Sequence, residues 1–216
     1  MRYTHAFFDL DGTLTNSAPG ITRSVQYALR KFGITPPPEK ELTVFVGPPL
    51  SQSFSKYFGM DAEQSLRAVE YYREYYRAKG MLENEVYEGI PELLCELNAR
   101  GAVCVLATCK PYEFAEKILS HFGLDRYFAF VSGPEMDGTR GEKHEVIAYA
   151  MEKLSVSDTD KILMIGDRDN DVLGAARFGI DCAGVLWGFG SREELQSAGA
   201  KHVCEKPMDL IDLFAN

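Results

Sequence analysis

The chain has 216 residues, of which 45% are hydrophobic and 25% charged, and its formal net charge is −9. This composition is typical of a globular protein, whereas broad binding to nucleic acid or to anionic membranes requires a basic surface. Every apolar run is well short of the roughly 18 residues that a membrane-spanning helix needs, and the stretch before Asp9 has no signal-peptide pattern. We therefore expect a cytoplasmic protein with no nucleic acid, membrane or obligate protein partner.

Short apolar runs alternate with segments of helical periodicity along most of the chain. Such alternation, with short joints, predicts right-handed crossovers and a parallel sheet. We therefore expect an α/β fold with a Rossmann-like parallel sheet core. The expected strands are 3–9, 102–107, 127–131, 161–165 and 181–185, and the expected helices are 90–100, 112–122, 143–154, 170–178, 192–198 and 208–215.

Residues 16–83 break this alternation, because they look helical throughout. A helical block inserted after the first strand predicts an all-helical cap domain at 16–83 and a core of 1–15 with 84–216. Such lobes commonly cover a site and move against the core. Its first helix is expected to follow a Ser17 cap, and two apolar stripes are expected to face inward: Ile21, Val25, Ala28, Leu29 and Phe32, then Ala62, Leu66, Val69, Tyr72 and Tyr76.

The five cysteines are odd in number, scattered, and without a CxxC pair. This spacing argues against a zinc site and against a disulfide framework. Cys95, Cys104 and Cys182 stand in apolar contexts and are expected to be buried, reduced thiols.

Polar clusters follow several of the expected strands. Because the carboxyl ends of parallel strands meet at one edge of a sheet, where ligands bind, these clusters are expected to converge. They are Asp9-Leu10-Asp11-Gly12-Thr13, Thr108-Cys109-Lys110-Pro111, Gly141-Glu142-Lys143 and the run from Gly166 to Asp171 that contains Asp167.

Converging carboxylates require a compensating charge, and hard oxygen ligands in a compact site suit Mg²⁺. The expected metal-site residues are Asp9, Asp11, Asp167 and Asp171.

Around that metal the clusters supply groups for phosphoryl transfer. Thr108 offers a hydroxyl donor, Lys143 a positive charge, and Gly12 a backbone turn that can direct N–H groups toward an anion. Such chemistry needs positioning, charge neutralisation and an in-line nucleophile. Asp9 can act as that nucleophile and form an aspartyl-phosphate, while Asp11 can protonate the leaving oxygen and then activate water.

These motifs resemble those of the haloacid dehalogenase superfamily over essentially the whole chain, helical cap included. Asp9-Leu10-Asp11-Gly12-Thr13-Leu14 matches its first motif, Thr108 the second, Lys143 the third, and GDRDND with Asp167 and Asp171 the fourth. The resemblance implies that Asp9 is nucleophile and Mg²⁺ ligand, that Asp11 is acid/base and ligates through its carbonyl, that Asp167 completes the metal site, and that Asp171 supports it directly or through water.

One position departs from the superfamily pattern. The second motif often reads Thr-Asn-Lys, and here it reads Thr108-Cys109-Lys110. If the family residue acts through its backbone N–H, Cys109 keeps that contact with phosphate, whereas an amide side-chain role would be lost.

Within the superfamily the chain is most similar to the phosphoglycolate phosphatase-like branch, whose relatives include nucleotidases. The segment FVGPPL at 45–50 resembles that branch's cap loop, and GDRDNDVLGA and Trp187-Gly188-Phe189-Gly190 also fit its pattern. Phe45, Gly47 and Pro48 are therefore expected to contribute to substrate specificity.

The resulting hypothesis is a Mg²⁺-dependent phosphatase that hydrolyses a small phosphorylated metabolite through an aspartyl-phosphate, in the manner of a phosphoglycolate phosphatase. The alternatives are a 5′-nucleotidase for nucleoside monophosphates, a pyrophosphatase, a sugar phosphomutase and a phosphate-sensing domain without turnover. Asp11 argues against a dehalogenase, and the cap lysines fit surface roles better than the Schiff base of a phosphonatase. A substrate carboxylate would favour Arg23, Lys56 or a backbone nest as its partner, and a nucleoside would favour an aromatic surface drawn from Phe45, Phe54, Tyr57 and Trp187.

Overall fold

The computed structural model describes residues 2–215. The chain forms two compact units: residues up to Thr15 together with those from Val86 onward, and the segment Asn16–Glu85. The short strands β2 (Thr15–Asn16) and β3 (Glu85–Val86) pair at the two points where the chain passes between the units. Among residues 2–215 no helix has the length and apolarity that crossing a bilayer demands.

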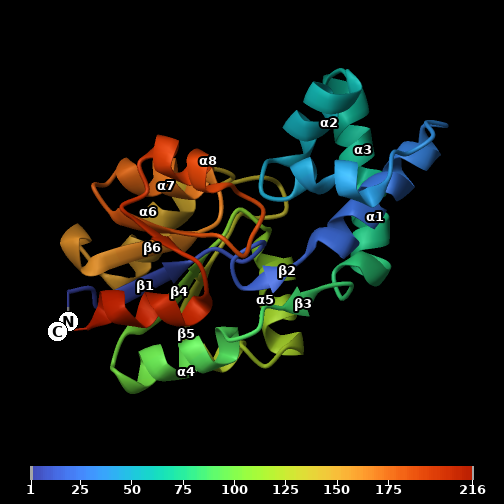
Figure 1. Ribbon diagram of the computed structural model, residues 1–216. Coiled ribbons are helices and arrows are strands. Elements are labelled where there is room, and N and C mark those ends of the chain that lie inside the picture. The colour runs from blue at the N-terminus through green and yellow to red at the C-terminus, as the bar shows by residue number, and fades with distance from the viewer. Residues whose placement is uncertain (1, 216) are drawn as a thin grey trace. The chain divides into compact units, whose positions relative to one another are not determined.

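The larger unit is built on a six-stranded parallel sheet in the order β5-β4-β1-β6-β7-β8 (Figure 1). The sheet and the helical insertion confirm the predicted fold class. The last strand was not predicted, because three residues without apolar alternation give no periodic signal. The strands are β1 (His5–Phe8), β4 (Val103–Ala107), β5 (Phe128–Ser132), β6 (Ile162–Gly166), β7 (Asp181–Val185) and β8 (His202–Cys204).

Helices cover both faces of this sheet (Figure 1). On one face α6 and α7 pack on the strands, and a fully buried cluster that includes Phe7, Val105 and Met164 lies beneath them. On the other face α4 packs beside the C-terminal segment. The helices are α4 (Ile90–Ala99), α5 (Tyr112–His121), α6 (Lys143–Leu154), α7 (Asp169–Ala176) and α8 (Arg192–Ala198), with short 3₁₀ turns η4 (Asp125–Tyr127) and η5 (Thr159–Lys161).

Two sequence expectations for this unit are confirmed only in part. The helix predicted at 208–215 is present, as a 3₁₀ helix, η6 (Pro207–Phe214). In a 3₁₀ helix, side chains three positions apart lie on the same face. Pro207 and Leu210 are spaced in this way, and both are buried, as is Ile211. Cys95 is exposed on α4, although Cys104 and Cys182 are buried as expected and all five cysteines are free.

The register of the central strands brings the predicted motifs to one edge. Phe8 of β1 pairs with Leu106 of β4 on one side and with Ile165 of β6 on the other. The residues that follow these three partners therefore leave the sheet at the same level. The N–H of Asp9 donates to the carbonyl of Ile165 at 2.9 Å, which fixes the start of the first motif to the end of β6.

The smaller unit is helical, as expected for the insertion. It contains α1 (Ala18–Lys31), η1 (Glu39–Glu41), η2 (Thr43–Phe45), α2 (Leu50–Phe58), α3 (Ala62–Tyr75) and a π-helical turn, η3 (Tyr76–Gly80). The first predicted stripe is confirmed for Ile21, Val25, Ala28 and Leu29, which are buried. Ser17 stands at the N-cap of α1, but its side chain makes no capping hydrogen bond.

The second predicted stripe is confirmed at Tyr72 and Tyr76, which are buried, but is wrong at Ala62 and Leu66, which are exposed. Leu66 is 63% exposed, and the buried residues of the helix are Ser65, Ala68 and Tyr72. Both α1 and α2 pack against α3. Tyr72 and Tyr76 stack with ring centroids 5.3 Å apart, so the tyrosine-rich run serves packing.

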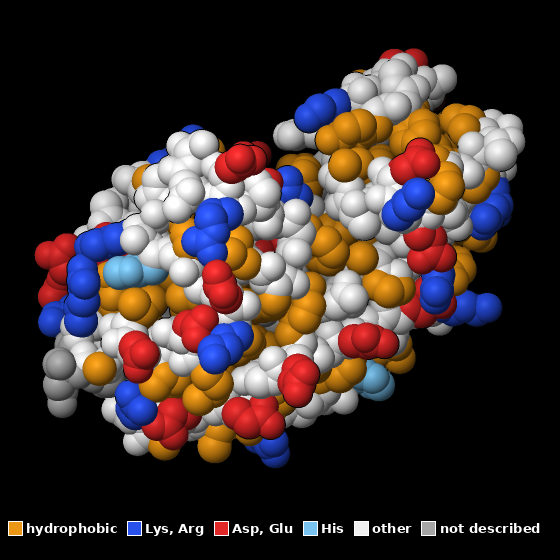
Figure 2. Space-filling model, viewed as in Figure 1, with side chains coloured by type: hydrophobic (Ala, Val, Ile, Leu, Met, Phe, Trp, Pro, Cys, Tyr) orange, Lys and Arg blue, Asp and Glu red, His pale blue; other side chains and the backbone are white. Residues whose placement is uncertain are grey.

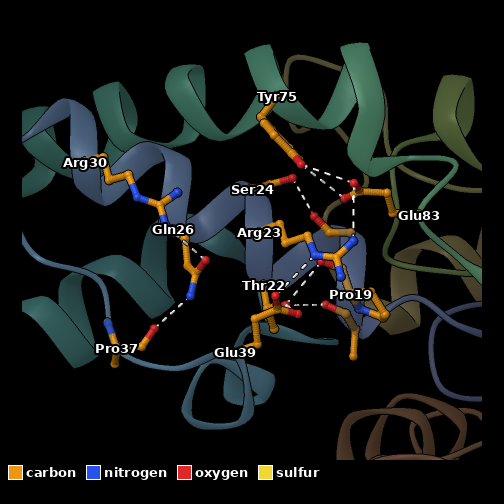
Figure 3. A network of polar contacts seen from close by, with 12 residues as sticks. Pro19, Thr22, Arg23, Ser24, Gln26, Arg30, Pro37, Glu39, Tyr75 and Glu83 are labelled. Carbon is orange, nitrogen blue, oxygen red and sulfur yellow. Dashed lines mark hydrogen bonds and ion pairs between the residues drawn. The ribbon is translucent and has the colours of Figure 1, made fainter.

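Arg23 on α1 is the centre of a polar network inside the helical unit (Figure 3). Its guanidinium lies 3.2 Å from Glu39 and 3.3 Å from Glu83. The hydroxyl of Tyr75 also donates to Glu83. Arg23 is thus committed to two carboxylates of its own unit.

Cationic and anionic side chains are interspersed on the surface seen in Figure 2. In that view no extended basic area interrupts this mixture, which is the pattern expected from the net charge of −9.

Replacing Gly20 by alanine should destabilise the protein, although alanine is the better helix former by about 1 kcal/mol. A Cβ at this position would lie 1.8 Å from the carbonyl oxygen of Gly80, so α1 and the π-helical turn would have to separate. We expect a net loss of about 1–3 kcal/mol, as for other overpacked sites, measured by thermal denaturation. Arg30→Ala, on an exposed position of the same helix, is the control, and a Gly20→Ala protein as stable as wild type would contradict this packing.

Candidate active site

Three buried carboxylates converge at the carboxyl edge of the sheet. Asp9 follows β1, Asp167 follows β6, and Asp171 lies in the first turn of α7. One oxygen from each lies within 4.8 Å of the others, and all three residues are buried. Such a cluster is unfavourable unless positive charge reaches it.

Lys143, the first residue of α6, supplies part of that charge. Its Nζ lies 2.7 Å from Oδ1 of Asp9 and 2.7 Å from Oδ1 of Asp171, and it donates to the carbonyl of Ala107 at 2.9 Å. Burial alone would lower the pKa of Lys143, but the carboxylates of Asp171 and Asp9 outweigh it and raise that pKa well above 10.5. The ammonium is therefore charged and holds Asp9 in place.

Lys143 forms ion pairs with Asp9 and Asp171, and Asp167 is the third carboxylate of the cluster. Its Oδ2 accepts a hydrogen bond from the N–H of Phe189 at 2.8 Å, whereas its buried Oδ1 has no hydrogen-bond partner within residues 2–215. Burial, followed by the charges of Asp171 and Asp9, raises the pKa of Asp167 well above its ordinary value. An unpartnered oxygen beside two further carboxylates fits a divalent cation, because hard cations take oxygen ligands.

A second ion pair lies beside the first and involves a residue to which the sequence analysis assigned no role. Nζ of Lys110 lies 2.8 and 2.7 Å from the two oxygens of Asp11, and both side chains are nearly buried. The sequence contained one signal for this lysine, since it is part of the polar cluster after β4. The sequence did not indicate that the Lys110 side chain points toward Asp11 in the first motif.

The remaining predicted phosphate-binding residues lie in the loops that carry these ion pairs. Thr108 is buried, and its Oγ1 accepts the N–H of Lys110 at 3.1 Å, which leaves its hydroxyl proton free to be donated. Gly12 has φ +87°, but its own N–H donates to the carbonyl of Thr15 at 2.8 Å. Burial raises the pKa of Cys109 to about 12, so its thiol is neutral near pH 7 and is not activated toward oxidation.

The three predicted specificity residues belong to the helical unit. Phe45 is buried against Phe54, with ring centroids 5.0 Å apart, whereas Gly47 and Pro48 are partly exposed. Trp187, named as a possible surface for a base, donates its indole N–H to the carbonyl of Thr13 at 2.9 Å.

A separate cavity of about 350 Å³ lies along the outer edge of β5. Its lining includes Tyr112, Phe130, Arg140 and Tyr149, and none of the clustered carboxylates borders it. It is therefore distinct from the carboxylate site.

Comparison with known proteins agrees with this arrangement. The haloacid dehalogenase-like hydrolase family matches residues 6–185. A 5′-nucleotidase from Pseudomonas aeruginosa is 47% identical over 204 residues, covering 94% of this chain and 92% of that protein. The tyrosine-protein kinase PtkA from Mycobacterium tuberculosis is 42% identical over 85% of this chain, but the aligned part spans only 62% of the kinase.

A more distant relative is a phosphoglycolate phosphatase from Vibrio parahaemolyticus, 28% identical over 96% of this chain and 94% of that protein. Among solved structures, a predicted phosphatase from Clostridium acetobutylicum superposes with a TM-score of 0.95 at 46% identity, covering 99% of both chains. Sequence, fold and the clustered aspartates thus lead to one assignment. The chain belongs to the haloacid dehalogenase-like hydrolases and is a phosphatase of that family.

Proposed function

We propose that the protein is a Mg²⁺-dependent 5′-nucleotidase that hydrolyses nucleoside monophosphates. The observation that carries this proposal is the 47% identity to a 5′-nucleotidase over 94% of the chain, against 28% to a phosphoglycolate phosphatase. The proposal therefore favours the nucleotidase alternative over the phosphoglycolate reading of the sequence.

The polar network of the helical unit supports the same choice. Phosphoglycolate carries a carboxylate that requires a cationic partner, and Arg23 was one candidate for it. Arg23 is already paired with Glu39 and Glu83. Two carboxylates therefore already balance its charge, which weakens its attraction for a substrate carboxylate.

In the proposed reaction the carboxylate of Asp9 attacks the phosphorus atom in line with the ester oxygen. An aspartyl-phosphate forms and the nucleoside leaves as its alcohol. Asp11 donates the proton to the leaving oxygen and then removes one from the water that cleaves the acyl phosphate. Lys143 holds Asp9 in position, and the Thr108 hydroxyl donates to a phosphate oxygen.

Asp9 and Asp167 would hold Mg²⁺, with the backbone carbonyl of Asp11 and with Asp171 directly or through water. The ion, when bound, supplies positive charge that offsets the carboxylates and the phosphate oxygens. The unpartnered Oδ1 of Asp167 is the feature of this chain that supports the assignment.

The direct test is phosphate release in the presence of Mg²⁺ from a panel of phosphorylated compounds. We expect the highest kcat/KM with nucleoside 5′-monophosphates. The panel includes phosphoglycolate, pyrophosphate and sugar phosphates, and a tyrosine peptide with ATP examines the similarity to PtkA. A clear preference for phosphoglycolate, or transfer to a second substrate in place of water, would overturn the nucleotidase assignment.

Replacing Asp9 by asparagine should reduce turnover by at least about 1,000-fold, because an amide is a far weaker nucleophile. The protein should remain folded, since asparagine has nearly the same volume. Steady-state phosphate release measures the loss, and Asp160→Asn, at an exposed position on η5, is the matched control. Undiminished activity of Asp9→Asn would exclude this residue as the nucleophile.

Replacing Lys110 by methionine should lower kcat by about 10²-fold or more, within the range that acid–base catalysis contributes. The change removes the cation that contacts both oxygens of Asp11 and leaves that carboxylate nearly buried without its partner. Lys117→Met, which removes an exposed lysine paired with Glu113 on α5, is the control. Equal kcat values for the two variants would show that Lys110 has no part in turnover.

Replacing Asp167 by asparagine should stabilise the metal-free protein at neutral pH and abolish its stabilisation by Mg²⁺. A carboxyl whose pKa is raised on folding opposes folding once the pH exceeds its ordinary value of 3.8, and asparagine removes that penalty. The gain should therefore be present near neutrality and vanish at about pH 3, where the carboxyl is protonated in both states. Thermal denaturation with and without Mg²⁺ measures both effects, and a Mg²⁺-dependent shift that survives in the variant would contradict the ligand assignment.

A further inference from the structure

The loop after β7, residues 187–190, joins two other loops of the carboxylate site. At its start the indole of Trp187 donates to the carbonyl of Thr13, in the loop after β1, at 2.9 Å. Two residues later the N–H of Phe189 donates to Oδ2 of Asp167, after β6, at 2.8 Å. The segment 187–190 thus forms hydrogen bonds with the loops after β1 and β6, which carry Asp9 and Asp167.

Two glycines allow this loop to approach closely. A Cβ at Gly188 would lie 2.3 Å from the carbonyl oxygen of Gly12 and 2.4 Å from the Cβ of Asp167. A Cβ at Gly190 would lie 1.9 Å from the carbonyl oxygen of Asp167. These contacts are with backbone or with the base of a side chain, so any larger residue would have to displace Asp167 or the first motif.

Because of this loop, the two carboxylate oxygens of Asp167 have different surroundings. Oδ2 accepts the N–H of Phe189, whereas Oδ1, beside the carboxylates of Asp9 and Asp171, has no hydrogen-bond partner in the described part of the chain. Like charges this close repel, and a side chain free to rotate would turn away from them. The hydrogen bond and the glycine contacts restrain that rotation.

We propose that the loop Trp187–Gly190 presets the position of Asp167 and thereby sets the metal affinity of the site. Its residues are positioning residues, because they act on the metal through Asp167. The inference rests on the metal role given to Asp9 and Asp167 above. Groups that orient the ligands of a metal commonly change its affinity by about 10–100-fold when they are removed.

The test is binding of Mn²⁺, as a spectroscopic substitute for Mg²⁺, to the purified full chain followed by electron paramagnetic resonance without substrate. Trp187→Phe removes the indole donor and adds no atom, and Gly188→Ala adds one methyl group against Asp167. Tyr127→Phe, which removes a polar group from an aromatic ring on η4, is the control. Circular dichroism and thermal denaturation of the metal-free proteins show whether each variant is folded.

We expect the Kd for Mn²⁺ to rise about tenfold or more in Gly188→Ala and about threefold or more in Trp187→Phe, with Tyr127→Phe unchanged. Folded variants that bind Mn²⁺ as tightly as wild type would overturn the inference and leave the proposed function intact. Should Gly188→Ala fail to fold, Trp187→Phe decides the question. A wild-type protein that binds no Mn²⁺ would overturn the metal role itself.

Discussion

The site depends on one electrostatic constraint, namely that three buried carboxylates share a space less than 5 Å across. Lys143 contacts Asp9 and Asp171 and brings one positive charge, so the three carboxylates retain an excess of negative charge when ionised. Burial, and after it the charges of Asp171 and Asp9, raise the pKa of Asp167. One oxygen of this carboxylate has no hydrogen-bond partner among residues 2–215. A divalent cation would balance the two negative charges that remain.

The sheet holds the loops that carry these carboxylates in fixed positions. Strands β1, β4 and β6 are buried on both faces and in register, so the loops that follow them start at one level of the sheet. Because Gly12 and Gly188 have no Cβ, the loops after β1 and β7 can lie close against the side chain of Asp167. The three carboxylates therefore cannot move apart easily, an arrangement that suits a metal site because a cation would relieve their repulsion.

Much of this arrangement could be predicted from the sequence. Apolar strands followed by Asp9 or Asp167 give a periodic and topological signal, because all parallel strands end at the same edge. The Lys110–Asp11 ion pair could not be predicted, since it depends on side-chain direction between loops about 100 positions apart. The start of the buried face of α3 was misjudged because Leu66 looks like a core residue by hydrophobicity, whereas the small residues Ser65 and Ala68 are the ones buried there.

The central claim is that Asp9 accepts the phosphoryl group. The most direct measurement is to quench the enzyme during turnover of a nucleoside monophosphate, reduce it with borohydride and map the modified peptide by mass spectrometry. An acyl phosphate at Asp9 is reduced to the alcohol, so the account predicts homoserine at position 9, dependent on substrate and Mg²⁺. Sustained turnover with an unmodified Asp9, or with the modification at another carboxylate, would contradict it.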